Sequence, residues 1–186
     1  MRPLVIGIAG GTASGKSTFC NLLVEELKEY RVEVIRTDKY FRRPLPKMIA
    51  PLTGEEHDDF NHPDSLDIDR FMVDFKSLLE EQNEIDIVIV EGLMVLYFEE
   101  IRRELDLKIF IQLDADERMY RRIKRNMEIM DWTMEEIADY YLDCVKYREK
   151  QYALRTNIYA DIILNGNNLD GVASKVVASW VLEQMS

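Results

Sequence analysis

Short apolar runs alternate along this chain with longer segments in which apolar residues recur every three or four positions. The runs are rich in Val and Ile, and they predict strands at residues 4–9, 33–37, 86–91, 107–113 and 161–164. Strands that are apolar at almost every position are typical of a parallel sheet covered on both faces. The pattern therefore predicts the α/β class, with a five-stranded parallel sheet in a three-layer α/β/α arrangement.

The periodic segments predict helices at residues 17–30, 67–81, 98–104, 115–126, 133–155 and 168–185. Thr133 and Glu136 have the spacing of a capping box, so a helix is expected to begin there. Residues 39–67 do not fit the alternation, because they hold four of the five prolines and show no sustained period. Long irregular segments are mostly functional or disordered. This one follows a strand's carboxyl end, where open α/β sheets bind ligands.

A glycine-rich loop joins the first predicted strand to the first predicted helix and matches the pattern G-x-x-x-x-G-K-[ST]. Glycines let the backbone turn so that its N–H groups point at phosphate oxygens, and the helix adds the positive end of its dipole. Lys16 supplies a point charge, and Ser17 offers a hydroxyl to Mg²⁺. An ordinary glycine-rich turn is the alternative. The sequence predicts a nucleoside triphosphate site at Gly10, Gly11, Thr12, Ala13, Ser14, Gly15, Lys16, Ser17 and Thr18.

Two carboxylates follow or end predicted strands. Asp38 lies just after the second strand, where a carboxylate beside a γ-phosphate can orient an acceptor hydroxyl and accept its proton. The alternative is that Asp38 only caps a turn. Glu91 ends the apolar run 87–91, where a phosphate-loop protein places a partner of Mg²⁺, and Gly92 beside it allows close approach.

Four arginines share one face of the predicted helix 115–126, since Arg118, Arg121, Arg122 and Arg125 follow the spacing i, i+3, i+4, i+7. In an acidic protein, such a one-sided stripe suits a movable lid that clamps phosphates. The alternative is a solvated face that pairs with nearby acids.

Composition bounds the remaining possibilities. The 186 residues suffice for one domain with a sizeable core, and the net charge of −11 argues against a nucleic-acid partner. No apolar run approaches the roughly 20 residues that span a bilayer, so no membrane association is expected. Cys20 and Cys144 are expected to be buried reduced thiols, and with no signal peptide they favour the cytoplasm.

Several segments together resemble the uridine kinase family of P-loop nucleoside kinases, and they occur in that family's order over most of the chain. They are GGTASGKS at Gly10, DKYF at Asp38, FNHPDSLD at Phe60, IVEGLMVLY at Ile89, LDADERMYRRIKRN at Leu113 and YADIILNG at Tyr159. The resemblance implies a P-loop NTPase fold in a single domain, 1–186, with an acceptor-binding segment at 39–66 and a helical lid at 115–132. It also implies ATP and Mg²⁺ as cofactors.

The resemblance implies roles for individual residues. Asp38 would be the catalytic carboxylate, acting with Lys16. The metal ligands would be Ser17, Glu91 and Asp38. Substrate contacts would come from Asp38, Tyr40, Phe41, Phe60, Asn61 and Arg122. The triphosphate would also meet Arg118, Arg122, Arg125 and, in the loop that holds adenine, Asn168.

The chain departs from the family where uracil is recognised. Residues 79–86 directly join two elements between which uridine kinases carry an extra base-reading segment. Asn61 replaces the family's ribose-binding aspartate, and Tyr140 stands where a base-contacting glutamine is usual. Residues 127–132 lack the family's further lid arginines. The shortened arm and the pair Tyr147-Arg148 also resemble nicotinamide riboside kinases.

The expected activity is transfer of the γ-phosphoryl group of ATP to a hydroxyl of a small molecule, most simply a nucleoside or another ribosyl compound. A cationic loop at Lys39, Arg42, Arg43 and Lys47 is either solubilising charge or a site for an anionic acceptor, as in a phosphoribulokinase-like sugar-phosphate kinase. A non-catalytic nucleotide-binding regulator is the other alternative, although the guanine-reading pattern Asn-Lys-x-Asp is missing. A homo-oligomer stays open.

Two further groups have structural interpretations. His57 and His62 are expected to cap or pack, and Trp132, Tyr140, Tyr141 and Tyr147 are expected in a helix core rather than in a stacking pocket.

Overall fold

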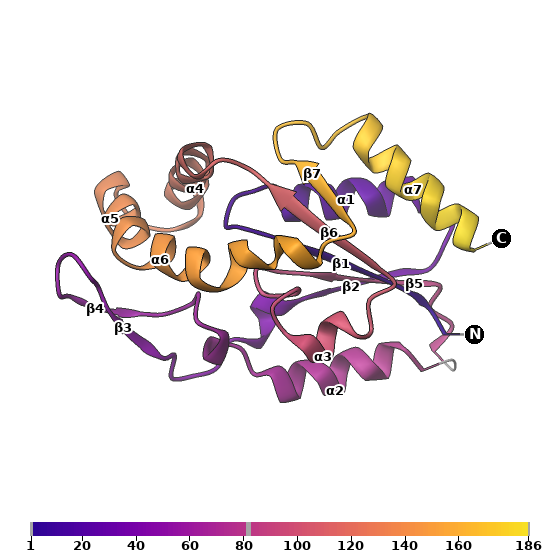
Figure 1. Cartoon of the computed structure of the whole chain (residues 1–186), viewed down its shortest axis with the longest axis horizontal. Helices are drawn as coiled ribbons and strands as arrows, with labels where there is room; N and C mark the ends of the chain where they lie inside the picture. The colour runs from indigo at the N-terminus through magenta and orange to yellow at the C-terminus, as the bar shows by residue number, and fades with distance from the viewer. Residues whose placement is uncertain (1, 81–82, 186) are drawn as a thin grey trace.

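The structure, a computed structural model, describes residues 2–80 and 83–185. Five parallel strands form one sheet in the order β2-β5-β1-β6-β7 (Figure 1). The strands are β1 (Leu4–Gly10), β2 (Val32–Arg36), β5 (Ile87–Glu91), β6 (Leu107–Gln112) and β7 (Ile162–Asn165). All five predicted strands are confirmed to within one residue at each end, as is the parallel sheet. The predicted end of one helix at Glu81, and both ends of the domain 1–186, lie outside the described residues.

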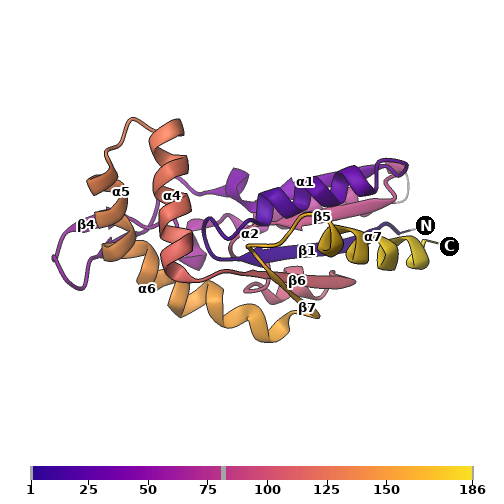
Figure 2. The same cartoon turned by 90° about the horizontal axis from the view of Figure 1, so that it is seen from above.

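Helices cover both faces of the sheet, and so confirm the three layers (Figures 1 and 2). On one face, Phe19 and Leu23 of one helix pack with Val177 and Val181 of another over the sheet's Ile and Leu side chains. On the other face, Phe71 and Phe75 pack with Ile101. These helices are α1 (Lys16–Glu26) and α7 (Val172–Gln184) on the first face, and α2 (Ile68–Leu78) and α3 (Glu99–Arg102) on the second.

The remaining helices gather at one end of the sheet, opposite to the two termini (Figure 1). α4 (Ala115–Ile129) and α5 (Met134–Tyr140) follow β6, and α5 begins with the predicted capping box of Thr133 and Glu136. The chain then continues through a π-helical turn (Tyr141–Val145), α6 (Lys146–Arg148), a second π turn (Glu149–Ala153) and a 3₁₀ segment (Leu154–Tyr159). The helix predicted at 133–155 is therefore longer and changes its hydrogen-bond period four times.

The segment 39–67 is more regular than the sequence predicts. It begins within a 3₁₀ turn (Thr37–Tyr40), forms a hairpin from β3 (Lys47–Ile49) and β4 (Glu56–Asp58), and ends near a second 3₁₀ turn (Pro63–Ser65). Glu-His-Asp in β4 has no apolar alternation, so the hairpin leaves no strand pattern in the sequence. The hairpin extends toward α5 at the same end of the molecule (Figure 2).

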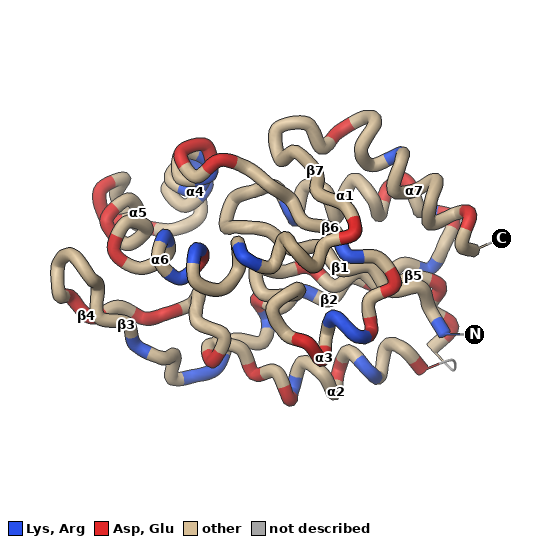
Figure 3. Tube along the Cα trace, viewed as in Figure 1, with Lys and Arg blue, Asp and Glu red and all other residues tan. Residues whose placement is uncertain are grey.

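The sheet register sets the position of the site. Ile8 of β1 pairs with Glu91 of β5, which in turn pairs with Arg36 of β2. The carboxyl ends of β1, β5 and β2 therefore meet at one edge of the sheet. The glycine loop, which follows β1, and Asp38, which follows β2, lie at that edge. Acidic and basic residues are interspersed along much of the trace (Figure 3). Among the described residues, no helix combines the length and apolarity needed to cross a bilayer.

Candidate active site

The glycine-rich loop wraps over the amino end of α1. Gly15 has a φ of 105°, a left-handed conformation that favours glycine, and Lys16 then begins the helix. Lys16 Nζ donates to the carbonyl oxygen of Gly11 at 2.8 Å. Burial lowers the pKa of Lys16, while the nearby carboxylates of Glu91 and Asp38 oppose that shift. A desolvated ammonium beside a glycine-rich loop at a helix N-terminus is suited to bind a polyphosphate.

A cavity of about 310 Å³ opens in front of this loop and joins elements that are far apart in the sequence. It brings together most of the predicted phosphate, acceptor and metal residues. The predicted residues that line it are Thr12, Ala13, Lys16, Ser17, Asp38, Phe41, Phe60, Asn61, Glu91, Arg122 and Arg125. An adjoining cavity on the outer side of the loop is lined by Gly15, Thr18 and Arg121 as well.

Oxygen donors suited to Mg²⁺ line the cavity. Ser17 Oγ donates to Glu91 Oε2 at 3.2 Å, and Glu91 is 6% exposed at the end of β5. Arg36 also approaches Glu91, with 3.4 Å between its Nε and Oε2. Asp38 lines the same cavity, is exposed, and its carboxylate has no hydrogen-bond partner within the described part of the chain. A hydroxyl and two carboxylates form the oxygen-rich donor set that Mg²⁺ prefers.

Gly92 is needed because β2 and β5 come close beside the site. A Cβ atom at this position would lie 1.9 Å from Thr37 Oγ1. We expect Gly92→Ala to displace the turn that carries Asp38 and to destabilise the fold by roughly 1–3 kcal/mol, the usual range for overpacking. Urea unfolding measures the free energy of unfolding. Gly54→Ala is the comparison variant, because a Cβ at Gly54 meets open space and the φ of 75° leaves backbone strain as the only cost. An unchanged free energy of unfolding for Gly92→Ala would contradict the close packing.

The four arginines of α4 do not act as one stripe. Arg122 Nη1 donates to Thr12 Oγ1 at 3.0 Å, and its buried Nε has no hydrogen-bond partner among the described residues. Arg125 lines the cavity beside Arg122. Arg121 turns instead to the loop after β7, where it donates to Gly166 O and Asn167 Oδ1. The unpaired Nε of Arg122 fits an anion in the cavity, because a buried donor of this kind rarely stays unsatisfied.

Arg118 differs from its prediction as a phosphate ligand. It is 2% exposed, and its Nη1 forms a 2.6 Å ion pair with Glu149 Oε2 behind the glycine loop. Its Nε donates to Leu113 O, and a Cβ on Gly11 would lie only 2.5 Å from its Nη1. Arg118 lines neither cavity at the loop. Its guanidinium is already neutralised, so it supports the loop from behind.

Tyr40 is likewise wrong as a substrate contact. Its ring is 6% exposed and packs edge-on against Phe71 of α2, and its hydroxyl donates to Asp74 Oδ2 at 2.9 Å. The 3₁₀ turn points Tyr40 into the core while it leaves Asp38 at the cavity. Phe41 and Phe60 do line the cavity, with their rings 5.3 Å apart and edge-on.

The aromatic residues after the lid correct another prediction. Tyr141 is buried, as expected of a helix core residue. Trp132 and Tyr140, however, line the cavity, with ring centroids 6.0 Å apart. Together with Phe41 and Phe60 they give the cavity an aromatic wall.

Asn168 is exposed, and its N–H donates to Asn165 O in the turn after β7. Its neighbour Asn167 accepts from Arg121 and donates to Glu117. A separate cavity of about 380 Å³ lies beside this turn, lined by residues that include Asp114, Glu117 and Asn167. The contact of Asn168 with adenine stays a prediction.

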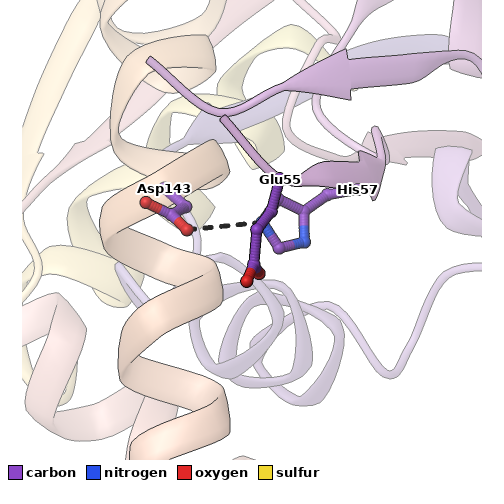
Figure 4. A group of neighbouring side chains, drawn as sticks. All are labelled: Glu55, His57 and Asp143. Atoms are coloured by element: carbon purple, nitrogen blue, oxygen red, sulfur yellow. Dashed lines mark hydrogen bonds and ion pairs between the residues drawn. The ribbon is translucent and has the colours of Figure 1, made fainter. Parts of the chain in front are cut away.

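The two histidines pack and cap, as predicted. His62 Nδ1 accepts from the N–H of Asp64 at the start of a 3₁₀ turn. His57 of β4 lies 3.4 Å from Asp143 of the first π turn (Figure 4). The His57 ring also packs edge-on against Tyr140. Glu55 lies beside this pair, and the three side chains are of types that bind cations. Asp143 also accepts from Thr53 at 2.8 Å, so the contacts dock the hairpin on the helix.

The basic loop does not reach the cavity. Lys47 forms an ion pair with Asp58 across the hairpin, 2.8 Å from Nζ to Oδ1. Arg42 donates to Leu66 O, and Arg43 lies over the Phe60 ring at 5.7 Å. These cations, with the exposed Lys39, line no part of the cavity. The loop therefore serves local structure and the outer surface.

Sequence patterns missed three charged residues next to the site. Glu149 accepts from the N–H of Thr12 in the glycine loop, and Arg148 forms an ion pair with the fully buried Asp59. Glu149 and Arg148 stand in a helical segment rich in charge, where exposed side chains are the usual expectation. Their burial depends on the π turns and on which segments dock there, and no short motif signals it.

Comparisons with known proteins agree with this geometry. The model described as "Phosphoribulokinase / Uridine kinase family" matches residues 80–170. A uridine kinase from Clostridium novyi (strain NT) is 32% identical over 209 residues, which cover 100% of this chain and 98% of that protein. That match includes the glycine loop and Asp38, which lie outside the family-model match.

Solved structures share the fold. A protein provisionally described as a fructose transport system kinase from Silicibacter sp. TM1040 has a TM-score of 0.64 at 15% identity, covering 88% of this chain and 90% of its own. A shikimate kinase from Bacteroides thetaiotaomicron has a TM-score of 0.52 at 17% identity, covering 98% of this chain and 97% of its own.

These neighbours support the P-loop three-layer fold, and the full-length relative supports more than the fold. A phosphate loop, a cavity with carboxylates and arginines, and 32% identity across both whole chains lead to one conclusion. This chain belongs to the phosphoribulokinase/uridine kinase family, and it is a kinase that transfers a phosphoryl group to a hydroxyl acceptor.

Proposed function

We propose that this kinase transfers the γ-phosphoryl group of ATP to a hydroxyl of an uncharged nucleoside or related ribosyl compound. The observation that carries the proposal is the cavity itself. Lys16, Ser17 and Glu91, which we assign to its phosphate end, line it together with aromatic rings that include Trp132 and Phe60, which we assign to its acceptor end. A polar phosphate end and an aromatic acceptor end match the two halves of such a reaction.

The glycine loop and Lys16 bind the β- and γ-phosphates through backbone N–H groups and one ammonium. Ser17, Glu91 and Asp38 would hold Mg²⁺, which when bound offsets the charge of the phosphates. Arg122 and Arg125 lie across the cavity, where their guanidinium groups stabilise charge on the transferring group and help to exclude water.

Asp38 orients the acceptor hydroxyl and accepts its proton as the oxygen attacks the γ-phosphorus. Its unpaired carboxylate faces the cavity from the turn after β2. Asn61, 6% exposed, lines the cavity beside Phe60, where its side-chain amide can bond a ribose hydroxyl. The acceptor-binding segment 39–66, the lid 115–132 and the single domain 1–186 belong to this proposal. The buried free thiols of Cys20 and Cys144 support the predicted cytoplasmic location.

The acceptor is proposed to be uncharged because no residue of the basic loop lines the cavity, although Arg43 lies over the ring of Phe60, which does line it. Arg122 and Arg125 belong to the phosphate end, and Asp38 and Glu91 add negative charge. This arrangement disfavours the sugar-phosphate kinase, which would need cations at its acceptor site. The relative from Clostridium novyi is named for uridine, which makes nucleosides the first acceptors to test.

A coupled assay of ADP release tests the function directly. The panel is uridine, cytidine, nicotinamide riboside, pantothenate and a pentose phosphate, each with ATP and Mg²⁺. We expect turnover with at least one uncharged nucleoside and none with the pentose phosphate. Turnover of the pentose phosphate alone would contradict the proposal, as would ATP hydrolysis that no acceptor changes.

Neutralising the basic loop provides an independent test. A variant with Lys39, Arg42 and Arg43 changed to Gln, and Lys47 left in its hairpin ion pair, is expected to change the KM of a nucleoside less than about twofold. The reason is that these side chains lie outside the cavity. Steady-state kinetics with the best acceptor of the panel measure this. A KM raised tenfold or more would show that the loop closes on an anionic acceptor.

A further inference from the structure

Two consecutive residues, Arg148 and Glu149, hold opposite sides of the active site. They lie where α6 passes into the second π turn, a local change of helix period that often marks functional positions. The change of period affects which way neighbouring side chains point. One side chain contacts the segment that forms the acceptor end, and the other contacts the glycine loop.

Glu149 is tied to the phosphate end. Its Oε1 accepts from the N–H of Thr12, and its Oε2 is paired with Arg118 at 2.6 Å. Thr12 in turn accepts from Arg122 through its hydroxyl, at 3.0 Å. The carboxylate of Glu149 also opposes the lowering of the Lys16 pKa that burial causes. Glu149 is 1% exposed, so nothing from solvent replaces these contacts.

Arg148 is tied to the acceptor end. Its Nε lies 2.5 Å from Oδ2 of Asp59, which is 0% exposed. The other oxygen of Asp59 accepts from the N–H of Asn61 at 3.1 Å. Asn61 lines the cavity. A set of partly buried polar contacts therefore runs from Asn61 to Thr12 through adjacent residues of one helical segment.

We propose that Arg148 and Glu149 are positioning residues that couple nucleotide binding at the glycine loop to the placement of the acceptor segment at Asn61. The proposal rests on the proposed function only in naming Asn61 part of the acceptor site. Buried charged pairs have narrow geometry and are costly to separate, so a shift of Thr12 on nucleotide binding moves Glu149. Arg148 is the next residue along the backbone, so it transmits the shift to Asp59 and Asn61.

Hydrogen exchange with ADP and Mg²⁺ as the only ligands tests the coupling without an acceptor. In the wild-type protein, nucleotide is expected to slow exchange in a peptide spanning residues 57–63 by about fivefold or more. Arg148→Met should bind ADP with a Kd within twofold of wild type and lose this protection. Arg155→Met, an exposed arginine further along the same helical segment, should keep it.

Glu149→Gln is expected to raise the Kd of ADP about fivefold or more in calorimetric titrations, and to lose the protection at 57–63 even when saturated. Glu135→Gln, exposed on α5, is its control. If Glu149→Gln folds poorly, the double variant Arg118→Met/Glu149→Met removes both buried charges and takes its place. With an acceptor from the panel, Arg148→Met should raise the acceptor KM and leave the KM of ATP unchanged.

Two results would overturn the proposal: full protection of residues 57–63 in Arg148→Met, or no protection in the wild-type protein saturated with ADP. Variants that change only thermal stability, with Kd, KM and protection intact, would show that both pairs are merely structural. If no acceptor in the panel is phosphorylated, the proposed function fails, while the exchange experiment still decides whether the two ends of the cavity are coupled.

Discussion

An Asp38→Asn variant is expected to bind ATP with nearly the wild-type Kd and to transfer the phosphoryl group at least about a hundredfold more slowly. The amide has the size of the carboxylate and keeps one oxygen toward the cavity, but it cannot accept a proton at neutral pH. Asp38 makes no side-chain hydrogen bond within the described residues, so the substitution breaks no packing contact. The loss should therefore appear in kcat rather than in folding.

Calorimetry with ATP and Mg²⁺ measures the Kd, and a coupled assay with the best acceptor measures kcat. Asp139→Asn, on the exposed side of α5, is the matched control and should turn over at the wild-type rate. Transfer that survives in Asp38→Asn near the wild-type kcat would show that another group accepts the proton. A large rise in the Kd of ATP would instead indicate that Asp38 acts mainly through the metal.

The parts of this molecule that a sequence predicts are those set by local or strictly periodic physics. The central strands β1, β5 and β6 are mostly buried apolar runs, because burial on both faces of a strand requires that composition whatever surrounds it. The edge strands β2 and β7 are only partly buried. The glycine loop is equally local, since the φ of 105° at Gly15 and the start of α1 at Lys16 follow from adjacent residues. The position of Glu91 at the end of its strand follows from the same run.

What the sequence does not predict depends on contacts between distant segments. Helical spacing correctly places Arg118 on the same side of the helix as Arg122. The guanidinium of Arg118, however, forms an ion pair with Glu149, 31 residues away in the chain, and so does not face the cavity. Tyr40 is two residues from Asp38 but faces the core, because the two residues lie in a 3₁₀ turn. The sequence pattern does not predict this turn. Trp132 and Tyr140 look like core residues in the sequence, but they line a cavity together with Phe41, Phe60 and residues of α4.

Lys16 connects function to stability. Binding a polyphosphate requires its charged ammonium, but burying that charge in the nucleotide-free protein costs folding free energy. Burial lowers its pKa below the ordinary value of 10.5 despite the opposing carboxylates of Glu91 and Asp38. The charged form is therefore less stable in the folded protein than in the unfolded chain. Where both states are protonated, at pH values below the lowered pKa, the full cost of that burial opposes folding.

We therefore expect Lys16→Met to weaken ATP binding by roughly 10- to 100-fold, the usual effect of losing a hydrogen bond to a charged group. The same change should raise the Tm of the nucleotide-free protein at pH 7 by at least about 2 °C. As pH rises from the lowered pKa toward 10.5, the unfolded wild-type chain binds more protons than the folded one, so wild-type stability rises and the advantage of Lys16→Met shrinks.

Calorimetric titrations with ATP, and melting curves between pH 7 and 10.5 without nucleotide, measure both halves of this prediction. Lys175→Met, on the exposed side of α7, is the control and should change neither quantity. Unaltered ATP titrations in Lys16→Met would remove the glycine loop from the nucleotide site. A lower Tm at pH 7 would mean that the electrostatic attraction to Glu91 and Asp38, and the hydrogen bond to Gly11, outweigh the desolvation of the ammonium. Lower ATP affinity together with a higher Tm would show that Lys16 serves binding rather than the fold. Replacing a purely structural lysine would instead lower both the affinity and the Tm.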